Sequence, residues 1–331
     1  MPISTTYNPN APAATTGQGA AVGNREDLSN ELAMLAPEET PLLSLCSKGK
    51  ASSTFYEWTA DKLDSVSTTG IAEGEDVSSF DDKFASRARL GNYCQIFRKP
   101  WLVSTLQDAV TTAAPANSAA AEAKAIRELK RNMEATICSA NEMSSENGAG
   151  TPYATRGFGK WVQVAAQATN PVPEEYRTPT ASILTATVTD ATLSTALGSI
   201  FSKTGEMQNL TLIANVALRR VISGLTRYEG ASRTSAYNVN QDATSKTVTL
   251  SVTLFESDFG VLKILNGNPD AMPGTNTHEG MIVNPKYIGF NTLIPMGSQR
   301  LENQGGGARG FIEAVGTFVC KHPQAHGKIA Y

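Results

Sequence analysis

Residues 117–143 read NSAAAEAKAIRELKRNMEATICSANEM and contain the clearest helical pattern of the chain. Asn117 or Ser118 can cap the first turn. At a rise of ~1.5 Å per residue, the predicted helix is about 40 Å long and would act as a strut. Its apolar face consists of Ile126, Leu129, Met133 and Ile137, at steps of three and four. The spacing of Lys124–Glu128 and Lys130–Glu134 predicts ion pairs on the other face.

The segment before this helix predicts a long hairpin. Thr54–Thr59 (TFYEWT) is rich in residues that favour strands, and Tyr93–Lys99 (YCQIFRK) is the expected return strand. About thirty mostly polar residues separate the two, and a loop of that length is unusual inside a compact domain. We therefore expect residues 51–100 to reach outward.

This predicted loop carries an acidic block followed by a basic block. Such blocks can meet complementary charges on another subunit. The alternative is a solvated loop whose charges keep it soluble. The candidate contact residues are Glu73, Glu75, Asp76, Asp81, Asp82, Lys83, Arg87 and Arg89.

Residues 1–24 contain no charged side chain. Alone, such a segment buries too little apolar surface to offset the entropy lost on ordering, so it is either a flexible terminus or an arm that orders on a neighbouring subunit. A short helix capped by Asn24 and ended by Pro37 follows, and then an apolar group at Pro41–Leu45 and a basic turn at 48–50.

Beyond residue 150, helical and strand patterns mix without a regular βαβ alternation, which predicts an α+β fold. A loop is expected over 165–182. Helices are expected at Ala191–Lys203 and Val216–Leu225. Asn266–Gly267 is typical of a hairpin turn. The expected strands are Gly157–Val164, Leu210–Ala214, Val248–Leu254, Val261–Leu265, Met281–Val283 and pieces from Tyr287 to Phe311–Lys321.

Composition excludes several classes of protein. The chain has 331 residues, 40% of them hydrophobic, and a net charge of −3. This excludes global disorder and argues against a dedicated nucleic-acid binder, although not against a container for nucleic acid. Apolar runs such as Leu212–Leu218 are too short to cross a membrane. The four dispersed cysteines indicate free thiols and synthesis in a reducing cytoplasm.

No catalytic, cofactor or metal site is predicted. The hydrolase, nucleotide-binding and metalloprotease motifs are absent. Cys320, His322 and His326 have some of the spacing of zinc ligands, but Pro323 interrupts them and no fourth ligand is near. Gly305–Gly307 lacks the Lys and helix of a phosphate loop and predicts a turn. The acidic run lacks the spacing of a calcium-binding EF-hand.

The order of these parts resembles the Hong Kong 97 fold of tailed-phage major capsid proteins, and the chain is similar to their SU-ten-like branch. The stretches that carry this resemblance are Pro41–Lys50 leading into Phe55–Trp58, Arg87–Gln107, Ala121–Ala135, Thr155–Trp161, Ser257–Leu265 and Ala325–Ile329. The resemblance implies an N-terminal arm (1–50), an E-loop (51–100), a peripheral domain (101–182) with a spine helix (117–143), an axial domain (183–290) and returning peripheral-domain strands (291–331).

The resemblance also implies a function. The protein would form hexamers and pentamers that tile an icosahedral shell around double-stranded DNA, with the E-loop over an adjacent subunit. Expected partners are further copies of the chain, a separate scaffolding protein (because only about 50 residues precede the E-loop), a portal, DNA held without sequence specificity, and a decoration protein as an open option. No enzyme activity, cofactor or membrane is implied.

Three other functions stay open at this point. The first is a cargo-enclosing nanocompartment of the same fold, the second an enzyme with an unrecognised site, and the third a decoration or tail protein. Lys62 and Lys83 lie in the E-loop, but nothing in the sequence shows the partner environment that covalent crosslinking between subunits would need.

Overall fold

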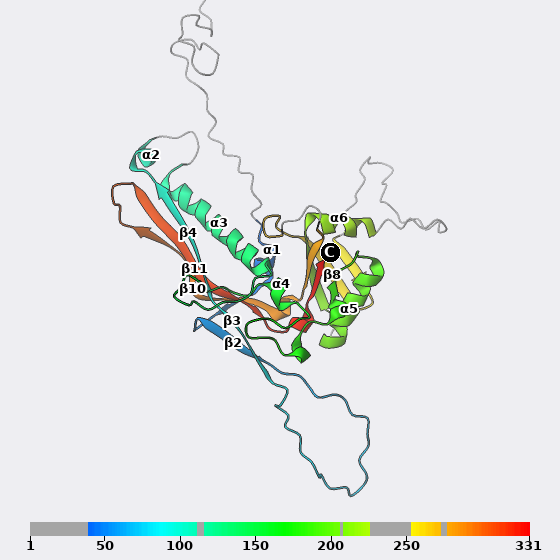
Figure 1. Ribbon diagram of the computed structural model, residues 1–331. Helices are drawn as coiled ribbons and strands as arrows, with labels where there is room; N and C mark the ends of the chain where they lie inside the picture. The colour runs from blue at the N-terminus through cyan, green and yellow to red at the C-terminus, as the bar shows by residue number, and fades with distance from the viewer. Residues whose placement is uncertain (1–38, 111–115, 206–207, 226–252, 273–276) are drawn as a thin grey trace, which may run out of the picture.

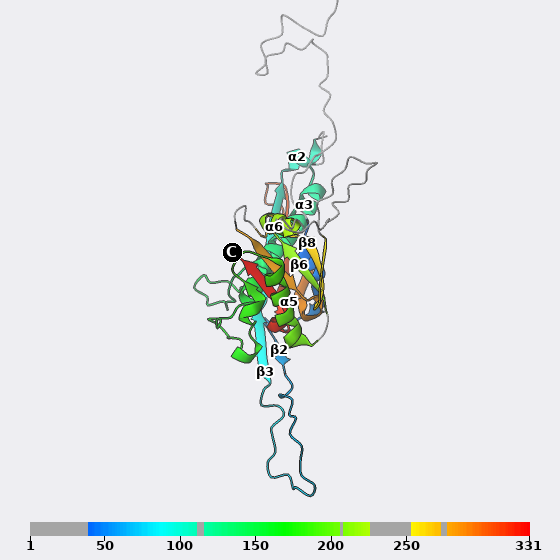
Figure 2. The same cartoon turned by 90° about the vertical axis from the view of Figure 1, so that its right-hand side faces the viewer.

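The computed structural model describes residues 39–110, 116–205, 208–225, 253–272 and 277–331. They form an elongated unit with a four-stranded sheet and the longest described helix, and a compact unit with a six-stranded sheet (Figure 1). A loop projects away from both units, as both views show (Figures 1 and 2). The architecture mixes helices and strands, as the α+β prediction requires.

The sheet of the elongated unit joins distant parts of the sequence. Gly305–Gly307 lie in the turn between its two longest strands, as predicted. Strands β1 and β10, the first two in the order given next, run parallel, and the other neighbouring pairs are antiparallel. The strand order is β1 (Ser47–Lys50), β10 (Ile288–Leu301), β11 (Ala308–Cys320) and β4 (Gln95–Val103).

Helix α3 (Ser118–Cys138) packs along β4 and β11 and buries Leu129 and Ile137 completely. The Asn117 side chain caps it by accepting a hydrogen bond from the Ala120 amide at 2.9 Å. The predicted C-terminal boundary of the spine helix, 117–143, is wrong, because α3 ends at Cys138. Ser139 takes an extended conformation and its hydroxyl donates to the Thr136 carbonyl at 2.7 Å, which satisfies a carbonyl without another helical turn.

The compact unit confirms the helices and strands predicted between residues 191 and 283, except for Val248–Leu254, of which only the last residues are described. Its sheet order is β5 (Ile183–Leu184), β12 (Gly327–Ala330), β9 (Glu279–Val283), β6 (Gln208–Ala214), β8 (Gly260–Asn266) and β7 (Leu254–Ser257). Helices α5 (Asp190–Thr204) and α6 (Val216–Leu225) pack on it with Leu193, Ile200, Leu218 and Ile222.

The hairpin that bears the loop has a different return strand from the predicted one. Strand β2 (Phe55–Ala60) pairs antiparallel with β3 (Ala88–Tyr93), and of the predicted return strand Tyr93–Lys99 only Tyr93 takes part, opposite Phe55. The Cys94 amide donates to the Thr54 carbonyl at 2.8 Å and ends the pairing. From Gln95 onward the chain forms β4 in the other sheet. The aromatic stretch YCQIFRK therefore belongs to two strands.

Three further local predictions are wrong. Gly157–Val164 contains a helical turn, α4 (Phe158–Trp161), because that turn places Phe158 and Trp161 together in the core. The basic turn at 48–50 is strand β1. Asn266–Gly267 does not close a hairpin, because β8 pairs with β6 and β7.

The predicted loop 165–182 contains two short 3-10 helices, η1 (Glu174–Tyr176) and η2 (Thr180–Ser182). The remaining short elements are α1 (Pro41–Leu45), α2 (Thr105–Ala109), η3 (Pro285–Tyr287) and η4 (Pro323–Ala325).

The packing also shifts the expected boundaries between parts. Residues 41–50, assigned to the arm, belong to the body, because Leu42 is fully buried and β1 extends the long sheet. Strand β4 begins before residue 100 and joins the elongated unit. Strand β12 returns to the compact sheet instead of the peripheral one. The arm proper and the helix expected between Asn24 and Pro37 lie outside the described residues.

Candidate interaction surface

Cys320 and His326 are buried in the core, and His322 is half-buried beside them. Among the described residues no group of three or more His, Cys, Asp or Glu could hold a metal ion. His326 is fully buried and its Nδ1 accepts from the Asn284 amide at 3.1 Å. Burial lowers its pKa to about 3 and raises the pKa of the Cys320 thiol, so both groups are neutral. No described helix has the length and hydropathy of a membrane span.

The projecting loop, residues 61–85, is exposed along its whole length. Its apolar side chains are exposed with the rest: Leu63 is 94% and Phe80 89% accessible. Four further exposed side chains of this kind are Val66, Ile71, Val77 and Phe84. Scattered exposed apolar residues are common, but six on one segment make this loop the candidate interaction surface.

The basic block predicted as a contact surface makes ion pairs within its own chain. Lys83 Nζ lies 2.7 Å from an Asp64 carboxylate oxygen and 3.5 Å from one of Asp81. The two arginines pair with the strand opposite: Arg87 with Asp61 at 3.0 Å and Arg89 with Glu57 at 2.5 Å. The hydrogen bond from Arg87 lowers the pKa of Asp61. The structure therefore pairs these cations with residues 57–64 and, apart from Asp81, not with the acidic block.

Apart from Asp81, the acidic block forms no ion pair with a cation of the described residues. Within the described chain, no Lys, Arg or His forms an ion pair with Glu73, Glu75, Asp76 or Asp82. Asp82 accepts only the Phe84 amide, at 3.0 Å, and Glu75 the Ala72 amide, at 3.2 Å. The eight predicted residues thus form two sets. Lys83, Arg87, Arg89 and Asp81 make ion pairs within the chain, and the other four make none among the described residues.

A buried polar network that the sequence did not reveal fixes the root of the hairpin. The Asn92 amide donates to Thr155 Oγ1 at 2.9 Å and to the Phe318 carbonyl at 2.7 Å, and accepts from the Arg156 amide at 2.8 Å. The Arg156 side chain is fully buried, pairs with Glu142 at 2.6 Å and lies over the Trp161 ring. Its burial lowers the pKa of its guanidinium. The sequence offers one signal of this network, which is a polar residue, Asn92, at an inward-facing position of a strand.

A second unexpected contact fixes the start of the described chain. Both carboxylate oxygens of Glu134, on α3, accept backbone amides of α1, from Leu42 and Leu43, at 2.8 Å each. Burial raises the pKa of this carboxyl, and the two hydrogen bonds oppose the shift. The ion pair predicted between Lys130 and Glu134 is therefore wrong. Glu128 pairs with Lys99, at 3.8 Å, and not with Lys124.

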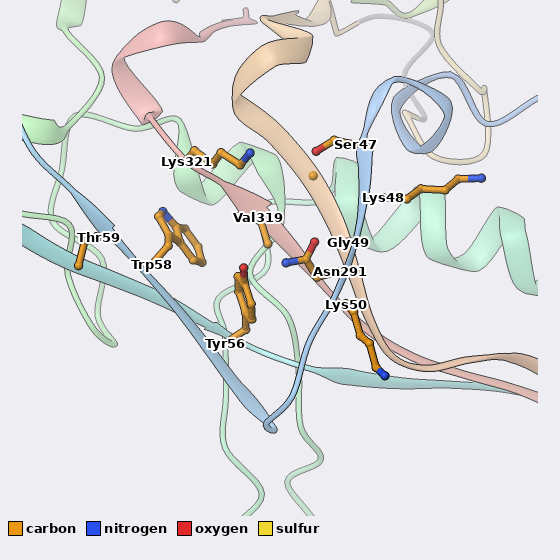
Figure 3. A pocket seen from close by; sticks show the side chains of 11 residues that line it. Ser47, Lys48, Gly49, Lys50, Tyr56, Trp58, Thr59, Asn291, Val319 and Lys321 are labelled. Atoms are coloured by element: carbon orange, nitrogen blue, oxygen red, sulfur yellow. The ribbon is translucent and has the colours of Figure 1, made fainter.

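A hollow of about 350 Å³ lies at the base of the hairpin, between β1 and β2 (Figure 3). Tyr56, Trp58 and Asn291 line it together with Lys50 and Lys321. The remaining lining residues are Ser47, Lys48, Gly49, Thr59, Gly289 and Val319. At position 49 an added Cβ would lie 2.1 Å from the side-chain oxygen of Asn291, so a larger residue there requires the Asn291 side chain to turn away.

Comparison with known proteins gives the setting of these surfaces. The family model described as SU10 major capsid protein matches residues 11–331. No curated protein sequence matches the chain. The capsid structure of cyanophage P-SCSP1u is similar with a TM-score of 0.63 and 10% identity over 98% of each chain. A chain of Gordonia phage Cozz follows at 0.57 and 15% identity, over 99% of this chain and 98% of that one.

A nanocompartment shell has the same fold. The holo-SrpI encapsulin complex of Synechococcus elongatus PCC 7942 is similar with a TM-score of 0.53 and 9% identity, over 93% of this chain and 92% of that one. All three structures are too distant in sequence to indicate more than the fold.

Proposed function

The chain belongs to the SU10 major capsid protein family, and from this premise we propose how its copies hold together. It is the major capsid protein of a tailed phage, it forms the icosahedral shell, and it is a component of the virion. Its role is structural and not enzymatic. The encapsulin likeness concerns the fold, and no observation on this chain favours a cargo compartment over a phage shell.

We propose that the projecting loop lies on a neighbouring subunit within hexameric and pentameric capsomers. The observation that carries this proposal is the set of six exposed apolar side chains on residues 61–85, which the other described residues do not cover. Burying one such side chain is worth ~1.5–3 kcal/mol, so several per subunit can hold a lattice of many copies. In this arrangement the elongated unit is the peripheral domain and the compact unit the axial domain.

We propose that the eight charged residues predicted from the sequence support the contact between subunits in two ways. Arg87, Arg89 and Lys83 keep the two sides of the loop together through their internal ion pairs. The acidic block meets cations of another copy. This set comprises Glu73, Glu75, Asp76, Asp81 and Asp82.

Further partners follow from the same proposal. The uncharged segment 1–24 is proposed as an arm that contacts another subunit. A separate scaffolding protein, a portal, a decoration protein and DNA bound without sequence specificity complete the proposed set.

Shortening the loop tests this proposal. We expect a chain in which a short Gly-Ser linker replaces residues 63–84 to remain a folded subunit, since that segment buries almost nothing, and to form no shells. Circular dichroism reports folding, and electron microscopy with sedimentation reports assembly. The double variant Ser65→Gly/Thr68→Gly is the control and should assemble. Shells of normal size from the shortened chain would refute the proposal.

A further inference from the structure

The hollow at the base of the hairpin offers positive charge without a described counter-charge. Lys48, Lys50 and Lys321 line it and are exposed, and none forms an ion pair with a carboxylate of the described residues. In Figure 3, Lys50 and Lys321 lie on opposite sides of Tyr56 and Asn291. In the same view the Lys48 and Lys50 side chains extend away from Trp58, so the lysines lie at the rim of the hollow while Tyr56 and Trp58 form its aromatic wall. A hollow of this kind fits an acidic segment that also carries an aromatic side chain.

The projecting loop contains a segment of this kind. Phe80 is 89% exposed and is followed directly by Asp81 and Asp82. Asp82 has no described cation, and Asp81 shares Lys83 with Asp64 at 3.5 Å, on the exposed surface. A surface pair at that distance contributes little, so Asp81 can exchange its partner.

The loop of one copy is directed away from its own hollow. The hollow lies where β1 meets β2, whereas the loop leaves from the far ends of β2 and β3 and extends outward in both views (Figures 1 and 2). Each copy therefore has one cationic hollow and one exposed acidic segment, which do not meet each other among the described residues. In an assembly of identical copies the two are present in equal number.

We propose that the hollow binds the Phe80-Asp81-Asp82 segment of a second copy. Phe80 packs against Tyr56 and Trp58, and the two aspartates pair with the lysines around them. This inference rests on the proposed function and names the partner residues on both sides. Phosphates of packaged DNA are the competing ligand. The aromatic wall beside only three lysines, in a chain of net charge −3, favours the peptide.

Exchange of charge tests the pairing. We expect Lys50→Glu/Lys321→Glu and, separately, Asp81→Lys/Asp82→Lys to lower the yield of shells roughly tenfold, because each places like charges together. The combined quadruple variant should recover most of that yield. Lys203→Glu, an exposed lysine in the last turn of α5, is the matched control and should assemble normally. Failure of the quadruple variant to recover would count against direct pairing.

Crosslinking tests the same contact by distance. All four native cysteines are buried and free, so Lys50→Cys/Asp82→Cys adds the exposed thiols, and mild oxidation of assembled shells should give covalent multimers on a non-reducing gel. Lys203→Cys/Asp82→Cys should give none.

The outcomes separate the two proposals. Absence of shells from the unmodified chain, even with its scaffold, would refute the proposed assembly. Shells without crosslinked multimers would refute only the hollow. Normal shells that lose DNA in the lysine variant would assign the hollow to nucleic acid and overturn this inference.

Discussion

The root of the hairpin and the loop that it bears differ in what surrounds their side chains. At the root, Asn92 is buried and each of its polar atoms has a partner in the body. Beyond Ala60 and before Ala88, polar and apolar side chains alike face solvent. The root is therefore fixed by the buried core of its own chain, whereas among the described residues the loop is held mainly by exposed ion pairs. The expected results of mutation follow this difference.

The largest effect on the subunit should come from the buried arginine. Arg156→Met removes the donor of the Thr169 carbonyl and the fully buried cationic partner of Glu142, although Glu142 keeps Lys160 and two backbone amides, and we expect a loss of ~3 kcal/mol in the free energy of unfolding. Arg89→Met is the matched control: its ion pair is exposed and should contribute about 1 kcal/mol or less. Urea unfolding of both full-length variants measures this contrast, and equal losses would break the comparison.

A smaller effect should appear with pH. Burial lowers the pKa of His326 from 6.5 to about 3, so between these values the unfolded chain binds a proton that the folded chain excludes. The stabilisation is present above pH 6.5 and is lost as pH falls toward 3, by up to a few kcal/mol.

His326→Asn offers an amide oxygen to the Asn284 amide and removes the titration. Unfolding of this variant should depend less on pH across that range than unfolding of the unmodified chain. An unchanged pH dependence would mean that other groups, such as Asp61, dominate the acid response.

The smallest effect on the subunit should come from the loop. Phe80→Ala should change the free energy of unfolding by no more than about 0.5 kcal/mol, because its ring contacts mainly solvent. The same change at the fully buried Phe318 should cost ~3–5 kcal/mol. Thermal unfolding of the two variants distinguishes them. A large loss at Phe80 would show that the loop packs on its own body.

Residue spacing along the sequence correctly predicted the elements that contacts between near neighbours in the chain determine. The steps of three and four through Leu129 and Ile137 gave α3 because one helix face buries them. The return strand was mistaken because burial of Asn92 depends on Phe318, which lies 226 residues away. Glu134 was assigned to its helical neighbour, although its partners lie 91 and 92 residues earlier. The hollow exists only because β1 pairs with β10, a contact that no local spacing encodes.

The central claim is that the loop is uncovered in the subunit and covered in the shell. Oxidative footprinting with mass spectrometry measures side-chain exposure in both states of the full chain. We predict that Leu63 and Phe80 are oxidised rapidly in unassembled subunits and become protected in shells, while Phe318 is protected in both. Equal oxidation of Phe80 in subunit and shell, or protection already in the subunit, would contradict the account.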